Sequence, residues 1–135
     1  MEARNTEMME NDNEILSVYL REINRIPLLS YDEEYELALK AKAGDKAARD
    51  RIINANLRFV VSVAKKFRGN GLPLSDLIDE GNIGLITALD KFEPEKGYHF
   101  ISYAVWWIRQ SIMKAISEKS RAVRLPLNRS NELIQ

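Results

Sequence analysis

The spacing of apolar residues constrains the fold of this chain more than any other feature. In each long segment, apolar residues recur at intervals of three and four, which places them on one face of an α-helix. The run FVVSV at 59–63 would suit a strand by residue type, but the spacing over the whole segment favours a helix. We therefore expect an all-α protein, a compact bundle of about five to six helices.

Turn-forming and capping residues divide the chain into these helices. Pro27 ends the first helix, Ser30 and Glu33 form a capping box that opens the second, and Asp45 caps the third. We expect helices at about residues 15–26, 30–43, 45–68, 73–89 and 102–121, the last starting at Ser102 or a neighbour. Pro126 predicts an extended segment, RLPL, after them.

The helices are expected to form one domain over residues 13–122, between a flexible lead at 1–12 and a linker at 123–135. A new helix is predicted near residue 128, so we expect a trimmed piece of a longer protein. The 135 residues include no cysteine, and the start MEARNTEMMENDNE does not resemble a signal peptide. No apolar run is long enough to span a membrane, so we expect a cytoplasmic protein without membrane contact.

Charge is distributed unevenly although the formal net charge is zero. From Lys96 to the C-terminus there are seven Lys or Arg residues and two acids, which gives this part a charge of +5. Any one of these lysines is explained by a solvated helix face. Their clustering with aromatic residues favours a nucleic-acid surface.

The stretch YAVWWIRQSI, residues 103–112, combines rings with polar and basic groups. Tyr103, Trp106, Trp107 and Gln110 lie along one side of a helix. Aromatic rings beside cations are typical of proteins that hold single-stranded nucleic acid. A tryptophan at helical spacing is more often part of a core, so one buried and one exposed tryptophan is the simplest expectation.

No catalytic set stands out, and we expect neither an enzyme nor a cofactor. The single histidine, His99, has no evident acid–base partner, and there is no glycine-rich phosphate loop. Asp76, Asp79 and Glu80 share a helix face. They are read as a solvated face, a docking surface for a partner or, least favoured, a magnesium site.

The stretches DLIDEGNIGL (76–85) and YAVWWIRQSI together resemble region two of bacterial sigma factors of the sigma-70 family, in its housekeeping-like branch. YLREINRIPLLS (19–30) is similar to the segment that precedes region two, and RAVRLPLN (121–128) to the start of region three. The resemblance runs from about residue 13 to the C-terminus. It implies a subunit that gives RNA polymerase its promoter specificity.

The resemblance also implies a polymerase-docking surface. In the family, the helix with DLIDEGNIGL-like sequence docks on a coiled coil of the largest bacterial polymerase subunit. The matching residues are Asp76, Asp79, Glu80 and Asn82. An anti-sigma factor is a further partner that the family allows, and an interaction module that binds polymerase without melting DNA is the competing interpretation.

The helix with two tryptophans captures, in the family, the non-template strand of the promoter minus-ten element. The flipped second-position adenine is held beside Tyr103, and Gln110 reads the first base pair. Residues assigned to this surface are Lys96, Phe100, Ser102, Tyr103, Trp106, Trp107, Arg109, Gln110, Met113 and Lys114. The pocket for the last thymine is matched by Leu20, Arg21, Asn56, Phe59 and Ser62, and phosphate contacts are expected from Arg121 and Arg124.

Met113 departs from the family pattern, because a polar residue is usual one turn after Gln110. A thioether donates no hydrogen bond. We therefore predict a weaker or altered choice of base at the first position of the hexamer.

Overall fold

The computed structural model of this chain describes the backbone of residues 2–134 and the side chains of residues 14–119. Within that part the protein is all-α, as predicted, with five α-helices and one short 3-10 helix. The elements are α1 (Glu2–Arg25), α2 (Tyr31–Lys42), α3 (Lys46–Lys65), α4 (Leu74–Lys91), η1 (Pro94–Lys96) and α5 (Phe100–Ile134). The run FVVSV lies inside α3, which confirms that it is helical.

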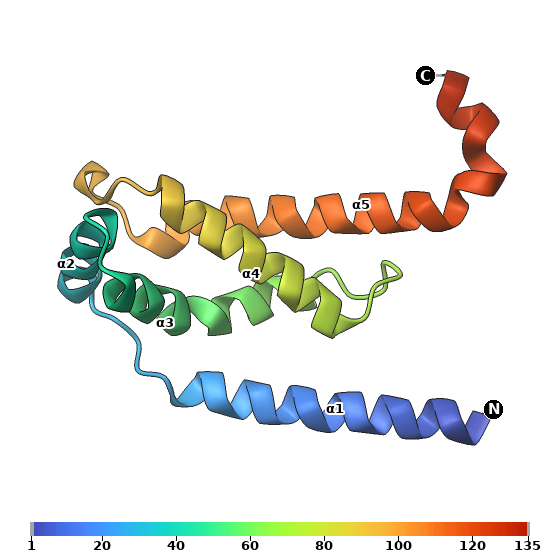
Figure 1. Ribbon diagram of the computed structural model, residues 1–135, viewed down its shortest axis with the longest axis horizontal. Helices are drawn as coiled ribbons and strands as arrows, with labels where there is room; N and C mark the ends of the chain where they lie inside the picture. The colour runs from blue at the N-terminus through green and yellow to red at the C-terminus, as the bar shows by residue number, and fades with distance from the viewer. Residues whose placement is uncertain (1, 135) are drawn as a thin grey trace.

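The bundle is built around α3, α4 and α5 (Figure 1). α4 packs on both α3 and α5, α2 packs on α3 at the end of the bundle where α5 begins, and α1 runs along α3. The largest fully buried side chains are Phe100, Ile52, Leu77, Leu85, Ile108, Ile112 and Val60. They come from α3, α4 and α5, so these three helices share one core.

Two glycines of α4 allow this close packing. A Cβ atom on Gly84 would lie 2.5 Å from the backbone oxygen of Trp107, and one on Gly81 would lie 2.6 Å from a methyl group of Val60. Glycine weakens a helix by roughly 1 kcal/mol relative to alanine. The close approach of α4 to α5 explains why it is present at Gly84.

Local capping residues fix the starts of α2 and α3 as predicted. Ser30 and Glu33 form a capping box, in which the Glu33 amide donates to Ser30 Oγ at 3.1 Å and the Ser30 amide donates to Glu33 Oε1 at 3.0 Å. The Asp45 carboxylate accepts a hydrogen bond from the Ala48 amide at 3.1 Å. Each cap satisfies an amide that has no partner within its helix.

α1 is attached to the bundle by an arginine of α3. The Arg58 guanidinium donates to the backbone oxygens of Asn24 and Ile26, at 3.0 and 2.8 Å. It therefore satisfies carbonyl groups at and just beyond the end of α1. Ile23 adds a buried apolar contact at the same end.

The outer limits of α1 and α5 differ from the predicted ones. α1 begins at Glu2, before the predicted start, and α5 extends to Ile134, past the predicted end near Arg121. RLPL lies within α5, so the prediction that this segment is extended is wrong. The flexible lead at 1–12 and the linker at 123–135 lie outside the residues whose side chains are described. They remain predictions.

Candidate nucleic-acid interface

α5 has an inner and an outer face with different chemistry. Phe100, Ala104, Ile108 and Ile112 recur every fourth residue and are fully buried. The outer face carries exposed apolar, polar and basic side chains: Val105, Trp106, Arg109, Gln110, Met113 and Lys114. This face therefore offers ring surface, hydrogen-bonding groups and positive charge to a ligand.

Four aromatic rings follow one another at the margin of α5, and we call Tyr98, Tyr103, Trp106 and Trp107 the aromatic edge. Successive ring centroids are 6.1, 6.4 and 5.1 Å apart, in the order Tyr98, Tyr103, Trp107, Trp106. Phe92 is buried in the core, with its ring 5.7 Å from that of Tyr103. These separations are those of packed aromatic pairs, so the rings hold one another in place.

The two tryptophans have different environments. Trp106 is 56% exposed, whereas Trp107 is half-buried and packs against the core. The expected split of one buried and one exposed tryptophan is met for Trp106, which is exposed, whereas Trp107 is only half-buried. The Lys91 ammonium lies 5.5 Å from the centroid of the Trp107 ring, within the range of a cation–π contact.

Two further basic residues of the predicted DNA surface are described. The Arg109 guanidinium is 5.7 Å from the centroid of the Phe67 ring, and Lys96 is exposed at the end of η1. The predicted phosphate contacts Arg121 and Arg124 lie outside the residues whose side chains are described. Of the described cations Lys91, Arg109 and Lys96, Lys91 is the one that contacts a ring of the aromatic edge.

One residue assigned to the DNA surface lies in the core, and another does not start its helix as predicted. Phe100 is fully buried, with its ring 5.2 Å from that of Phe92, because it begins the inner row of α5. It supports the aromatic edge from beneath and does not reach the surface. Ser102 is exposed, but α5 already begins at Phe100, so Ser102 is not its cap.

The cap of α5 comes from another helix. Glu34 of α2 is buried, and its Oε1 accepts a hydrogen bond from the Phe100 amide at 2.8 Å. Our sequence analysis did not identify Glu34. A clue was present, because Glu34 precedes the buried Ala38 by one turn and so lies on the inner face of α2.

The predicted thymine pocket divides into two. Leu20, Phe59 and Ser62 line a pocket between α1 and α3. Asn56 lies on the other side of Phe59, in a pocket that Glu34 also lines. Asn56 is buried, and its Nδ2 donates to the Ile52 oxygen at 2.7 Å.

Arg21, the fifth residue of that predicted set, is exposed on α1. It is not among the residues that line either of the two pockets. Phe59 is the one residue that lines both. The predicted set therefore surrounds Phe59 without forming a single cavity.

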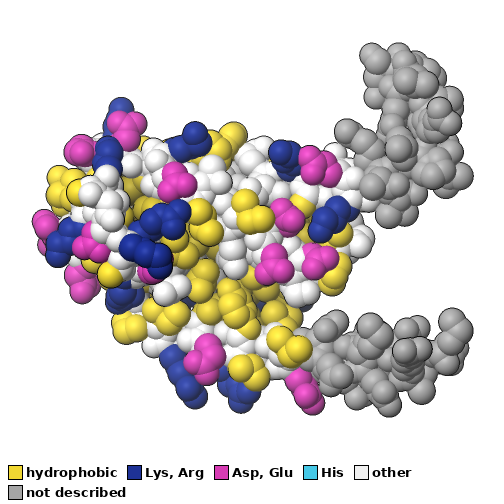
Figure 2. Space-filling model, in the orientation of Figure 1, with side chains coloured by type: hydrophobic (Ala, Val, Ile, Leu, Met, Phe, Trp, Pro, Cys, Tyr) yellow, Lys and Arg dark blue, Asp and Glu magenta, His cyan; other side chains and the backbone are white. Residues whose placement is uncertain are grey.

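The outer side of α4 is acidic, and we call Asp76, Asp79 and Glu80 the acidic face. Asp79 is exposed, and Asp76 and Glu80 are half-buried. Glu80 lies 3.9 Å from the Lys119 ammonium of α5. Figure 2 shows carboxylates and hydrophobic side chains side by side over α4.

Asn82, predicted with the docking residues, points instead toward α1. Its Nδ2 donates to the Tyr19 hydroxyl at 3.4 Å, and its Oδ1 is buried with no hydrogen-bond partner among the described residues. Asn82 lines a groove between α1 and α4 with Leu16 and Ile78. It lies three residues after Asp79, which lines the same groove, so Asn82 is at the side of the acidic face nearest α1.

Two isoleucines that our sequence analysis did not single out extend the acidic face. Ile83 is 54% exposed and Ile86 is 37% exposed. They follow Asp79 by four and seven residues, so all three lie on one side of α4. The outer side of this helix thus combines negative charge with apolar surface.

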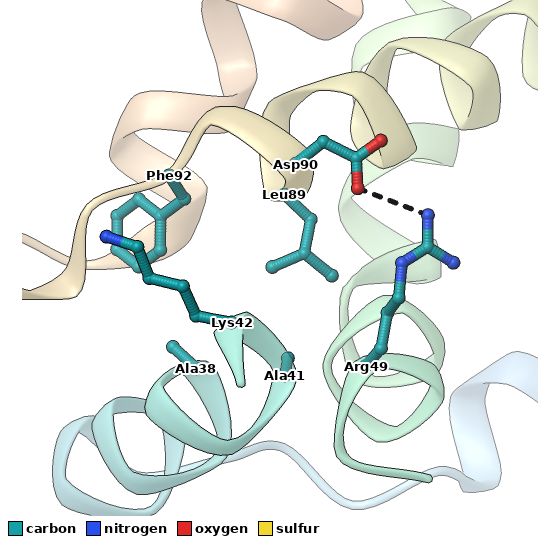
Figure 3. Close-up of a pocket in the computed structure, with 7 residues that line it drawn as sticks. All are labelled: Ala38, Ala41, Lys42, Arg49, Leu89, Asp90 and Phe92. Atoms are coloured by element: carbon teal, nitrogen blue, oxygen red, sulfur yellow. Dashed lines mark hydrogen bonds and ion pairs between the residues drawn. The ribbon is translucent and has the colours of Figure 1, made fainter. Parts of the chain in front are cut away.

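A further pocket lies where α2, α3 and α4 meet (Figure 3). Its walls combine apolar side chains, among them Ala38 and Leu89, with charged ones, and the Arg49 guanidinium donates to Asp90 across its rim at 3.3 Å. Phe92 forms part of the wall. The same side chain contacts Tyr103, so this pocket lies behind the aromatic edge.

Neither a metal-ligand group nor a membrane-spanning helix is found among the described residues. Asp76, Asp79 and Glu80 do not form a group that could hold a metal ion, and no other such group lies within residues 14–119. None of the helices, as far as they are described, is long and apolar enough to cross a membrane.

The family comparison identifies the family to which this helical bundle belongs. Residues 52–122 match the family Sigma-70 region 2, and residues 14–47 match Sigma-70 factor, region 1.2. The chain therefore belongs to the sigma-70 family, as its motifs predicted. Sigma factors are transcription initiation factors and not enzymes.

Curated relatives agree with this assignment. The chain is 50% identical to an RNA polymerase sigma factor SigA from Bacillus sp over 86% of its length, and 50% identical to SigA from Clostridium acetobutylicum over 82%. It is 51% identical to RpoS from Coxiella burnetii over 86%. The aligned parts cover between 29% and 33% of these proteins, so the chain spans about a third of the length of the relatives it matches.

Proposed function

We propose that this chain is the part of a sigma factor that docks on RNA polymerase and recognises and melts the promoter minus-ten element. The observation that carries the proposal is the aromatic edge. Its rings are packed against one another and stay accessible beside the basic outer face of α5. Each base that stacks on such a ring contributes roughly 1–3 kcal/mol.

Base capture is a binding process and requires no catalytic group. Flipping a base out of a duplex costs a few kcal/mol. A hexamer rich in T·A pairs contains pliable TA steps, so its melting is comparatively easy. Preferential binding of the single strand then shifts the population toward the open form.

The half-buried Tyr103 is the proposed partner of the flipped second-position adenine. Its ring is held between Tyr98 and Trp107, which reduces the entropy lost when a base stacks on it. The exposed Trp106 is then directed toward the upstream duplex end. Gln110 and Met113, exposed one turn apart beyond it, adjoin the first base pair.

The capture of the last thymine is proposed at Phe59. Pockets on both sides of its ring are open to a base, one beside Ser62 and the other beside Asn56. The Asn56 Nδ2 group donates to the Ile52 oxygen, and this bond leaves the Asn56 Oδ1 atom to accept a hydrogen bond from a base. This favours the Asn56 side of Phe59 as the pocket.

The acidic face is the proposed docking surface for the polymerase core. Its carboxylates adjoin the exposed Ile83 and Ile86. Charge that attracts a partner from a distance, beside apolar area that is buried on contact, is the usual composition of an interface. Docking without DNA melting is the second candidate function, because this face lies apart from the aromatic edge.

Binding to two single-stranded oligonucleotides tests the proposal. One contains TATAAT and a fluorescent label, and the other differs only by cytosine at the second position. We expect the second oligonucleotide to bind at least roughly tenfold more weakly than the first. This loss corresponds to about one stacked and hydrogen-bonded base. The measurement is made with the chain alone and with polymerase core, so that a requirement for polymerase is seen.

Equal affinity for the two oligonucleotides under both conditions would contradict the adenine pocket. Polymerase binding that persists in that case would support the second candidate function. Loss of both activities would contradict both candidates.

A further inference from the structure

The first turn of α5 has no cap of its own. His99 precedes the helix, and it is neither a serine, a threonine, an asparagine nor an aspartate, the residues that usually cap an N-terminus. The first amides of a helix have no partner within it. The Phe100 amide instead donates to Glu34 Oε1, a residue that lies 66 positions earlier in the chain.

Glu34 is firmly held in this role. Its side chain is only 10% exposed. A buried carboxylate is stable only when it is hydrogen-bonded or paired, and here it lies at the positive end of the α5 dipole. His99 Nδ1 is 3.9 Å from the same oxygen, and the Tyr31 ring packs edge-on against the His99 ring with centroids 4.9 Å apart.

The capped turn leads directly to the aromatic edge. Phe100 packs on Phe92 at 5.2 Å, and Tyr103, almost one turn further on, packs on the same ring at 5.7 Å. A shift of the first turn therefore moves Tyr103 relative to Phe92. On its other side, Glu34 lines the pocket that contains Asn56 and Phe59.

We infer that Glu34 is a positioning residue, which fixes the start of α5 to α2 and thereby sets the place of Tyr103 for base capture. This inference rests on the proposed function of the aromatic edge. Glu34 acts through Tyr103, and the carboxylate itself need not touch the adenine. It joins the two proposed base-binding places, the aromatic edge and the Phe59 pocket, through a single side chain.

Amide hydrogen exchange of the whole chain tests the cap directly. We expect Glu34→Ala to speed exchange in the first turn of α5 by roughly 3- to 30-fold, the usual effect of losing an N-cap. Glu34→Gln keeps an acceptor but not the charge, so its effect should be smaller, about two- to fivefold. Glu36→Ala, an exposed change on the same helix, is the matched control and should leave this turn unchanged.

The same variants are then titrated with the TATAAT oligonucleotide and its second-position cytosine counterpart. We expect Glu34→Ala to reduce the ratio of the two affinities several-fold, and Glu34→Gln to restore most of it. General destabilisation lowers the folded fraction and changes both affinities alike, so it leaves the ratio unchanged.

The inference would be overturned if the amides in the first turn of α5 exchanged at the wild-type rate in Glu34→Gln and, where it folds, also in Glu34→Ala. An unchanged affinity ratio in a folded Glu34→Ala protein would also overturn it. If the alanine variant does not fold, the exchange rate of the first turn of α5 in Glu34→Gln decides the question. Tyr103→Ala separates the two levels: if it leaves the ratio unchanged, the proposed function fails. If Tyr103→Ala brings the two affinities together while Glu34→Ala leaves their ratio unchanged, the proposed function holds and only the role of Glu34 fails.

Discussion

The outer sides of α4 and α5 differ in how their side chains are held. On α5, the rings of the aromatic edge contact one another and the core, so their positions are set before any ligand binds. On α4, the acidic face consists of separate carboxylates, of which Glu80 has an ion-pair partner at 3.9 Å. Preordered rings suit the recognition of a particular base, whereas loosely held charges suit long-range attraction of a large partner.

The largest expected effect destabilises α4 and α5 together, so it changes both outer sides at once. Gly84→Ala would place a methyl group 2.5 Å from the backbone oxygen of Trp107. Backbone cannot move aside as a side chain can, so we expect a loss of at least about 2 kcal/mol in the free energy of unfolding. Urea denaturation measures this loss.

Gly81→Ala is the matched control for that change. Its methyl group would meet side-chain atoms of Val60 and Ile112, and not backbone. Val60 is buried and stiff, so the crowding is not relieved freely, but the gain in helix propensity offsets part of it. We therefore expect a smaller loss than for Gly84→Ala. Equal losses in the free energy of unfolding for the two variants would mean that the close backbone contact at Gly84 is no more sensitive to an added methyl group than the side-chain contact at Gly81.

The next effect separates the two sides. Tyr103→Ala removes the central ring of the aromatic edge and should weaken single-strand binding by roughly 1–3 kcal/mol, with polymerase binding unchanged. Fluorescence titration with the TATAAT oligonucleotide measures it. Tyr103→Phe keeps the ring and should bind nearly as wild type, and Tyr35→Ala, on α2 and outside the aromatic edge, should not weaken DNA binding.

The reverse separation is expected on α4. Asp76→Ala and Glu80→Ala should each weaken polymerase binding, by about 1 kcal/mol as is typical for a charge at the rim of an interface, and spare DNA binding by the chain alone. The effect should shrink at high salt, because salt screens the attraction between charges at the surfaces of the two partners. Competition with labelled chain for polymerase core measures it; weakened DNA binding with intact polymerase binding would refute the assignment.

The smallest expected effect concerns α2, which holds the start of α5. Hydrogen bonds from Ser30 hold the pKa of Glu33 below its ordinary value of 4.5, and the backbone amide contributes more than the hydroxyl. Because the pKa is lower in the folded state, this stabilisation is present above pH 4.5 and is lost as the pH falls through the lowered value. The difference in melting temperature between wild type and Glu33→Gln should therefore narrow in acid; a constant difference would contradict it.

Features that depend on neighbours along the chain were predictable. The all-α fold follows from the three- and four-residue spacing, and the capping box of Ser30 and Glu33 uses atoms three residues apart. The different exposure of the two tryptophans follows from the 100° between adjacent helical residues. Family membership followed from the motifs that carry these same residues.

Features that depend on contacts between helices were not predictable. A motif assigns a residue to a position but does not give the direction of its side chain. Phe100 and Asn82 were thus assigned to surfaces, although one is in the core and the other faces α1. The bond from the Phe100 amide to Glu34 joins residues 66 apart, and nothing local to either residue specifies the other.

The course of α3 has a consequence for how this protein can be divided. The two family matches end at residue 47 and begin at residue 52, whereas α3 runs from Lys46 to Lys65. The boundary between two named segments thus falls within one helix, past its Asp45 cap and across Arg49, which bonds to Asp90. These segments record shared ancestry and are not independent building blocks, so a chimera joined at that boundary would interrupt a helix, whereas one joined before Ser30 would keep α2 and α3 intact.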